Sequence, residues 1–161
     1  MGKTALICGL IQALPEYGWT AVKVTDHVHE GLPAMYEEET PGDRTDAARY
    51  LKAGARRAFL LAAEDDELAL GIEELREKLD EGAHLLFESN RVLQFVRPDV
   101  ALAVDNGAGA ASFSLVLYGA DALVVHAQHD ATLADERPVF ELAAFEHISA
   151  EMCAWLRKKL R

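Results

Sequence analysis

The chain has 161 residues, half of them apolar and 27% charged, so it has the length and composition of a single globular domain spanning residues 1–161. Its 16 Lys and Arg stand against 27 Asp and Glu, a net charge of -11, which argues against nucleic acid or an anionic membrane surface as a partner. No apolar run is long enough to cross a bilayer and no basic-then-apolar leader opens the chain, so we expect a cytoplasmic protein.

The first element in chain order is an apolar helix that begins with Gly2-Lys3-Thr4. Gly-Lys-Thr at a helix start is the second half of a phosphate-binding P-loop, G-x-x-x-x-G-K-[ST]. In that motif the N–H groups from Gly2 to Ala5 point at the nucleotide phosphates, Lys3 reaches their outer oxygens, and the Thr4 hydroxyl binds Mg²⁺. The same tripeptide is also compatible with an ordinary helix start.

A complete P-loop follows a buried strand and has a further glycine five positions before Gly2. Neither is present in this sequence. We therefore expect a strand and the first half of the loop upstream, with Met1 as an internal methionine taken for a start. A second copy of the chain, in a homodimer, is another source for that strand.

Short apolar runs alternate with helical stretches in the rest of the chain. The runs are continuous rather than alternating, as in strands that are covered on both faces. This pattern predicts an α/β fold, a three-layer sandwich with a mainly parallel sheet that is P-loop NTPase-like and lacks its first strand. The predicted strands are Ala21–Val24, Ala58–Leu61, Leu85–Phe87, Val100–Val104, Ala122–Val125 and Val139–Leu142.

Helices are predicted between these strands at Asp43–Lys52, Asp66–Leu79 and Ser149–Leu160. Asp65 or Asp66 is the expected cap of the second of these helices. The acidic run at 37–39 is expected to be a solvated loop.

With its opening tripeptide, the chain resembles the molybdopterin-guanine dinucleotide biosynthesis protein B family of P-loop proteins. Three further segments carry the resemblance: Thr20–His29, a strand that ends in a histidine-bearing loop; Asp46–Ala55, similar to a D-[ST]-x-R…A-G-A helix; and His84–Asn90, similar to an apolar strand that ends in Glu-Gly. The likeness covers roughly residues 2 to 125. Ala47 replaces the family's hydroxyl residue and Ser89-Asn90 follows Glu88 in place of glycine, which suggests a divergent branch.

The resemblance implies binding of GTP with Mg²⁺, slow hydrolysis at most, and a supporting role in attaching a nucleotide to the molybdenum cofactor. A molybdopterin guanylyltransferase is the partner protein that it implies. Arg49 lies in the family-like helix and is the preferred contact to a phosphate or a pterin acid. Lys23, Lys52 and Arg44 are the other candidate cations for the same purpose.

Ligands of parallel sheets bind beyond the carboxyl ends of the strands, where Asp26 and Glu88 follow two of the apolar runs. Both carboxylates are candidates for holding Mg²⁺ directly or through water, opposite Thr4. An Asx-turn at Asp26 and a helix cap at Glu88 are the structural alternatives. Asp130 lies where many GTPases read guanine, although it is the only matching residue of the Asn-Lys-x-Asp tetrad.

Two other functions are compatible with the sequence. The first is a non-catalytic remnant of the fold that acts as an interaction module. The second is a metal-binding module built from His27, His29, His126 and His129, which follow two of the predicted strands.

Overall fold

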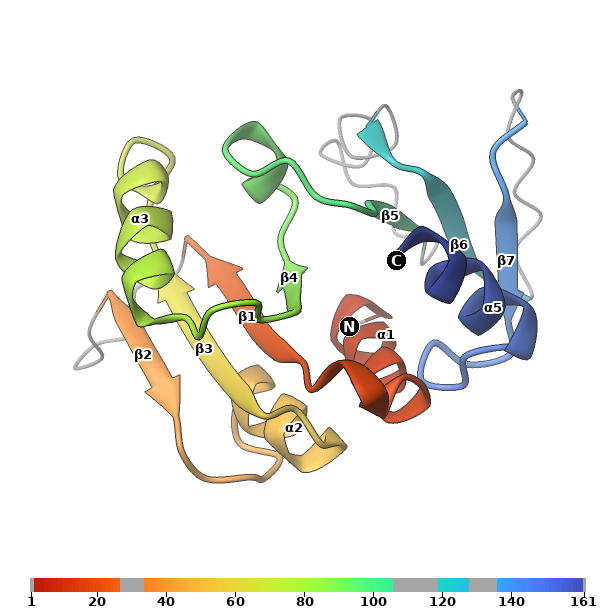
Figure 1. Ribbon diagram of the computed structural model, residues 1–161, viewed down its shortest axis with the longest axis horizontal. Helices are drawn as coiled ribbons and strands as arrows, with labels where there is room; N and C mark the ends of the chain where they lie inside the picture. Colours follow the sequence, from red (N-terminus) through yellow and green to blue (C-terminus); the bar gives the residue numbers. More distant parts are fainter. Residues whose placement is uncertain (1, 27–33, 106–118, 128–135, 161) are drawn as a thin grey trace.

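The computed structural model describes residues 2–26, 34–105, 119–127 and 136–160 of the chain. These residues alternate between strands and helices and form two β-sheets, one mixed and one wholly parallel (Figure 1). The α/β class expected from the alternation is confirmed at this level. Two short 3₁₀ turns, η1 (Pro15–Tyr17) and η2 (Val92–Gln94), connect the larger elements.

The first sheet has the strand order β2-β3-β1-β4. At its centre, β1 (Thr20–Thr25) pairs in parallel with both β3 (Arg57–Ala62) and β4 (Leu85–Glu88). Ala21 and Val22 are fully buried on opposite faces of β1, which explains why the run is continuously apolar. The register places Lys23 of β1 directly beside Glu88 at the end of β4.

The strand β2 (Met35–Glu38) was not expected from the sequence. The acidic run predicted to be a solvated loop instead contributes Glu37 and Glu38 to this edge strand, which pairs antiparallel with β3. Glu37 accepts hydrogen bonds from Arg57 Nε at 2.7 Å and Nη2 at 3.0 Å. Glu38 is buried and accepts from Thr45 Oγ1 at 3.2 Å. Charged side chains are common on short edge strands because they discourage pairing with another chain.

The second sheet consists of β5 (Leu102–Asp105), β6 (Ala122–His126) and β7 (Val139–Leu142), all parallel and in that order. Each lies within two residues of a predicted strand. The helix α5 (Ala150–Lys159) packs beside this sheet, and the Ser149 side chain caps it by accepting from Met152 N at 3.2 Å.

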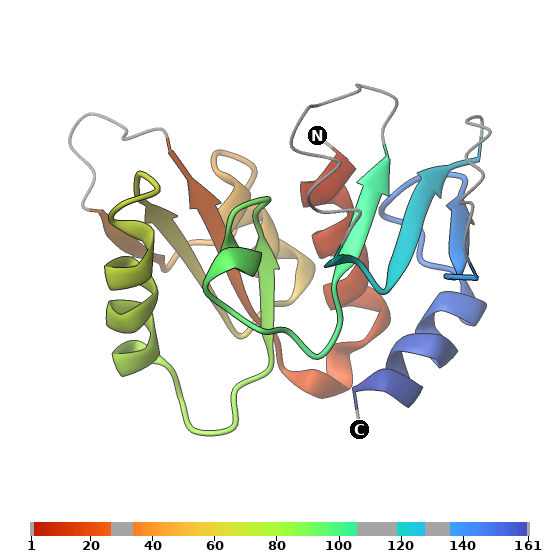
Figure 2. The ribbon, with the colours of Figure 1, turned by 90° about the horizontal axis from the view of Figure 1, so that it is seen from above.

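The helices cover the first sheet on both faces (Figure 2). On one face, α3 (Leu68–Lys78) packs its apolar stripe against Val22, Phe59 and Leu61. On the other face lie α2 (Asp46–Ala53) and α1 (Gly2–Ala13). The expected cap of α3 was wrong, because its N-cap residue is Glu67, without a side-chain bond, and Asp65 instead pairs with Arg91 at 2.8 Å.

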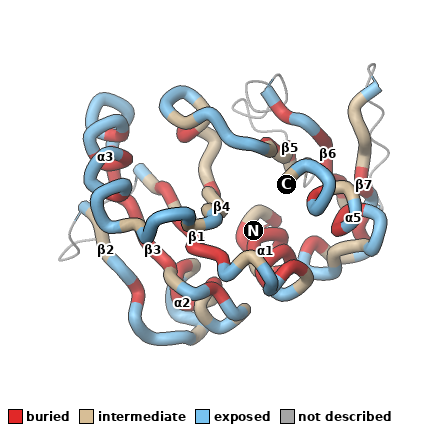
Figure 3. Tube along the Cα trace, viewed as in Figure 1, coloured by how far each residue is buried: buried red, intermediate tan, exposed pale blue. Residues whose placement is uncertain are grey.

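The helix α1 joins the two sheets through one hydrophobic core. It contacts both β4 and β5, and its apolar residues share a cluster with side chains of both sheets and of α5. Figure 3 shows most of this helix as buried. Within the described ranges, β4 pairs only with β1 and β5 pairs only with β6, so the two sheets are not hydrogen-bonded to each other. The interval between them lies over α1 (Figures 1 and 2).

Candidate functional site

The first turn of α1 meets the carboxyl end of β4 at a buried polar contact. Thr4 Oγ1 lies 2.9 Å from both carboxylate oxygens of Glu88, and it donates its proton to this carboxylate. Thr4 is 4% exposed and Glu88 is 6% exposed. Two polar side chains that are 84 positions apart in the chain are thus held together inside the core, where an unpaired carboxylate would be costly. The rule that ligands bind beyond the strand ends is the reason that the sequence pointed to Glu88.

Two more side chains donate to the same carboxylate. Lys23 Nζ, from β1, lies 2.7 Å from Glu88 Oε1, and the Tyr50 hydroxyl, from α2, donates to Glu88 Oε2. Tyr50 is fully buried because α2 presents it to the sheet. Sequence reasoning missed Tyr50, although its position on the buried face of α2, four residues after Asp46, was a usable signal.

The Lys23 ammonium also pairs with a second carboxylate, that of Asp46. Asp46 Oδ2, in the first turn of α2, lies 3.1 Å from Lys23 Nζ, and Asp46 Oδ1 lies 3.6 Å from Arg49 Nη1. The side chains of Lys23, Asp46 and Arg49 are 24%, 33% and 39% exposed, so this ion-pair network leads from buried Glu88 towards solvent.

Lys3 approaches the same region from α1. Its ammonium donates to Asn90 Oδ1, two residues after Glu88. The loop that carries Asn90 is fixed by Ser89, whose Oγ accepts from Arg91 N at 3.0 Å and Val92 N at 3.1 Å. The Ser89 side chain, which directly follows Glu88, therefore organises this loop.

The environment shifts the pKa values of three of these groups. Burial lowers the pKa of Lys3, a shift that the Glu88 carboxylate opposes and the Lys23 charge reinforces. Burial acts to lower the pKa of Lys23 as well, but its hydrogen bonds and charge pairing with Glu88 and Asp46 outweigh this and raise it. Burial together with the Glu88 charge raises the pKa of the Tyr50 hydroxyl, so Tyr50 remains a neutral donor.

Three cationic side chains gather in this cluster, although the chain as a whole is strongly acidic. Lys3, Lys23 and Arg49 contribute three positive charges, and Glu88 and Asp46 contribute two negative charges. The whole chain carries a net charge of -11. An excess of positive charge at the start of a helix suits an anion, because the helix N–H groups are oriented in the same sense.

The other predicted site residues divide into two groups. Gly2 is buried and Ala5 half-buried, both in the first turn of α1, and Asp26 is exposed directly after β1. His126 ends β6, with its ring centroid 6.0 Å from that of Phe145. The remaining candidates, Asp130, His27, His29 and His129, lie outside the described residues. Among the residues that the structure describes, no three His, Cys, Asp or Glu side chains are grouped as metal ligands.

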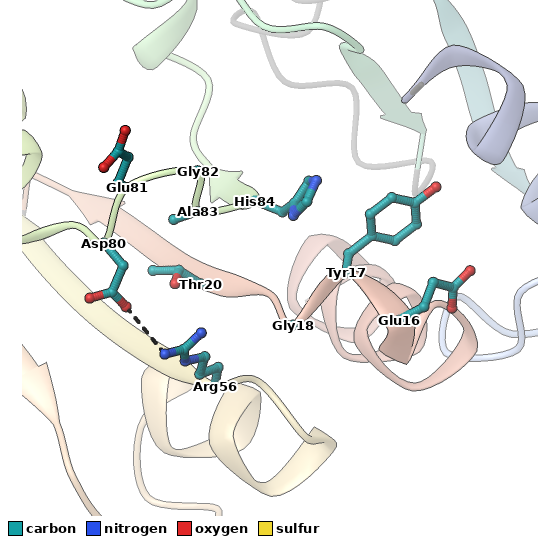
Figure 4. A pocket seen from close by; sticks show the side chains of 10 residues that line it. All are labelled: Glu16, Tyr17, Gly18, Thr20, Arg56, Asp80, Glu81, Gly82, Ala83 and His84. Atoms are coloured by element: carbon teal, nitrogen blue, oxygen red, sulfur yellow. Dashed lines mark ion pairs between the residues drawn. The ribbon is translucent and has the colours of Figure 1, made fainter.

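A pocket lies at the opposite end of the first sheet, beside the amino ends of β1, β3 and β4 (Figure 4). The rings of Tyr17 and His84 form one side, 5.1 Å apart between centroids. The ion pair between Arg56 and Asp80, at 3.9 Å, forms another. None of the site residues predicted from the sequence lines this pocket. It is therefore distinct from the cluster of side chains around Glu88.

Comparison with family models, with curated proteins and with solved structures finds no significant match for this chain. Within the described part of the chain, every helix is too short or too polar to span a membrane.

The chemistry of the cluster is that of hard oxygen donors beside ammonium groups. Because Thr4 gives its proton to Glu88, the lone pairs of its hydroxyl oxygen face away from the carboxylate and could coordinate a cation. Hydroxyl and carboxylate oxygens are the ligands that Mg²⁺ prefers, with water completing its shell. The residues present therefore fit a magnesium ion that is held together with an anion.

Proposed function

We propose that this chain binds a magnesium–nucleoside triphosphate complex where the start of α1 meets the carboxyl end of β4. The observation that carries the proposal is the buried hydrogen bonding between Thr4 and Glu88, 2.9 Å to each carboxylate oxygen. It joins the Gly-Lys-Thr segment to a strand-end acid, as a P-loop threonine and its acidic partner require. The finer fold assignment, a P-loop NTPase-like sandwich, is part of the same proposal.

Each residue then has a defined role in binding. The N–H groups from Gly2 to Ala5 and the Lys3 ammonium hold the phosphates. Thr4 and Glu88 would hold Mg²⁺, Glu88 directly or through water, and the ion would neutralise charge on the phosphates. Asp26 is an additional candidate for a water or metal contact at the end of β1.

Among the described residues, we assign no dedicated catalytic base, so slow hydrolysis or binding alone fits better than rapid turnover. The preference for GTP rests on the family resemblance, as do Arg49 as a phosphate or pterin contact and a role beside a molybdopterin guanylyltransferase in molybdenum cofactor guanylation. Asp130 is the proposed guanine contact because it aligns with the Asp of the Asn-Lys-x-Asp tetrad of GTPases.

Calorimetric titration with GTP, GDP and ATP in the presence of Mg²⁺ tests the proposal. We expect Lys3→Ala to lose nucleotide binding and keep its folded circular dichroism spectrum, because Lys3 is half-buried and its ammonium bonds to Asn90 in the loop after β4. Lys52→Ala is the matched control, since Lys52 is an exposed lysine paired with Asp43 at 2.6 Å. Equal nucleotide affinity in Lys3→Ala and the wild type would refute the phosphate role.

The separation of the two sheets favours a second candidate, a strand-accepting interaction module. Within the described ranges, β4 and β5 each leave one edge without a strand partner, and these edges lie on either side of α1. An added strand, from residues preceding Gly2 or from a second copy, could pair with these edges. Nucleotide binding only by a chain extended upstream would support the first proposal, and a stable dimer without nucleotide binding would support the second.

A further inference from the structure

The contacts of Glu88 differ in what happens to them when a metal ion binds. Thr4 can keep donating to the carboxylate, because the ion would use the lone pairs of Thr4 Oγ1. The Tyr50 hydroxyl is on Oε2 and can also remain. The Lys23 ammonium is different, because it places a positive charge 2.7 Å from Oε1, and this charge would repel a cation that approached Glu88.

We propose that Lys23 is a built-in competitor for the metal position on Glu88, so that a free divalent cation is disfavoured and a metal–polyphosphate complex is accepted. The proposal rests on the proposed function for the position of the metal. It goes beyond that function in assigning a selective role to a residue outside the Gly-Lys-Thr segment.

Electrostatics supports this competition. Lys3 and Lys23 both bring ammonium groups to the end of β4, so a lone divalent ion would be repelled by two neighbouring cations. A metal–nucleoside triphosphate complex is a net anion, and it brings the phosphate charge that balances the lysines. The metal ion therefore gains access to Glu88 together with the polyphosphate.

The structure also provides an alternative partner for the displaced ammonium. Asp46 Oδ2 already lies 3.1 Å from Lys23 Nζ, and the Lys23 side chain is 24% exposed. Lys23 can therefore leave Glu88 and remain paired with Asp46 at the solvent side, without a change in the pairing of β1.

Titration with Mn²⁺ alone, followed by electron paramagnetic resonance of the free ion, tests the competition. We expect Lys23→Met to bind Mn²⁺ about tenfold more tightly than the wild type, the change expected when one charged hydrogen bond to Glu88 no longer competes with the ion. Lys23→Arg, which keeps the charge, should stay within about threefold of the wild type. If Lys23→Met does not fold, as judged by circular dichroism, Lys23→Gln takes its place.

Arg49→Met shows whether the gain in Mn²⁺ affinity comes from freeing Glu88 or only from removing a positive charge near the site. Arg49 belongs to the same cluster but contacts Asp46 rather than Glu88, so its removal should tighten Mn²⁺ binding by less than about threefold. Equal gains in Lys23→Met and Arg49→Met would overturn the proposal, as would no gain in Lys23→Met.

A parallel titration with Mn²⁺ and GTP, run on this chain and on a chain extended upstream, distinguishes this inference from the proposed function. If Lys23→Met gains affinity for free Mn²⁺ but neither chain binds GTP, the exclusion of the free ion by Lys23 holds and the nucleotide proposal fails. If either wild-type chain binds Mn²⁺ with GTP and Lys23→Met gains nothing for free Mn²⁺, the nucleotide proposal holds and the competition is wrong.

Discussion

Replacing Glu88 with Gln tests whether the buried cluster exists in solution. The Glu88 side chain is 5% exposed and accepts from Thr4, Lys23 and Tyr50. Gln keeps the shape but turns one acceptor oxygen into an NH₂ donor. Whichever way the amide is oriented, this NH₂ then faces the Thr4 hydroxyl together with either Lys23 or Tyr50.

The expected loss follows from those contacts. A hydrogen bond to a charged group contributes about 1.5–3 kcal/mol, and removing one partner of a buried ion pair costs about 3–5 kcal/mol. Asp46 still compensates part of the Lys23 charge, so the expected loss is near the lower end, about 3 kcal/mol of unfolding free energy. Replacement of a whole buried pair can be neutral, but here the three donors stay while the negative charge and one of the two acceptor oxygens are lost.

Urea unfolding followed by circular dichroism at pH 7 measures this loss. With a urea dependence of about 2 kcal/mol per molar, the midpoint should fall by roughly 1.5 M. Glu37→Gln is the matched control, because Glu37 also lies on a strand and pairs with an arginine, but its side chain is 40% exposed. That change should cost less than about 1 kcal/mol. If Glu88→Gln is no less stable than Glu37→Gln, the cluster is wrong and the proposed site is wrong with it.

Two further predictions concern packing and alkaline stability. A Cβ at Gly9 of α1 would lie 2.7 Å from the backbone oxygen of Glu146, so Gly9→Ala should lower the unfolding free energy by about 2 kcal/mol. Gly71→Ala is the control, because the atom nearest to its added Cβ, at 2.8 Å, is a methyl group of Leu61 that can turn aside. Urea unfolding should show that this change lowers the unfolding free energy by less than about 1 kcal/mol. Equal losses in the two variants would contradict the close approach of the Glu146 backbone to Gly9. Burial and the adjacent carboxylate raise the pKa of the Tyr50 hydroxyl in the folded state. The contribution of this hydroxyl to the unfolding free energy is therefore complete below about pH 10, the pKa of an unfolded tyrosine, and is lost as the pH rises towards the pKa of the folded state. Tyr50→Phe should therefore show a shallower fall in urea midpoint between pH 8 and 10.5, and an unchanged slope would contradict the shift.

The sequence predicted well those strands whose burial shows in their own residues, as a continuous apolar run. The six expected strands appear with shifts of no more than two residues, because a strand covered on both faces needs a continuous apolar run. The strand β2 could not be predicted in this way. Its sequence, Met-Tyr-Glu-Glu, becomes a strand because β3 offers an edge to pair with and Arg57 offers a partner for Glu37.

The site was predictable only in part for a similar reason. Thr4 could be identified because it lies at the start of an apolar helix, and Glu88 because it directly follows an apolar strand. The contributions of Lys23 and Tyr50 depend on the sheet register and on how α2 packs, because Glu88 is 65 positions from Lys23 and 38 from Tyr50. The sequence indicated Lys23 only as one of several candidate cations and did not predict its contact with Glu88, and it gave Tyr50 no role in the site.

The sign of the whole-chain charge is a poor guide to what this cluster binds. A net charge of -11 disfavours extended anionic partners, whose recognition needs many cations over a wide surface. Charges at a protein surface are screened over about 8 Å at physiological ionic strength, so a small ligand responds mainly to its nearest groups. At the start of α1 those groups are Lys3, Lys23 and the helix N–H groups, with Glu88 buried beneath them. A chain with a strongly negative net charge can therefore still carry the local group of cations that the proposed nucleotide site requires.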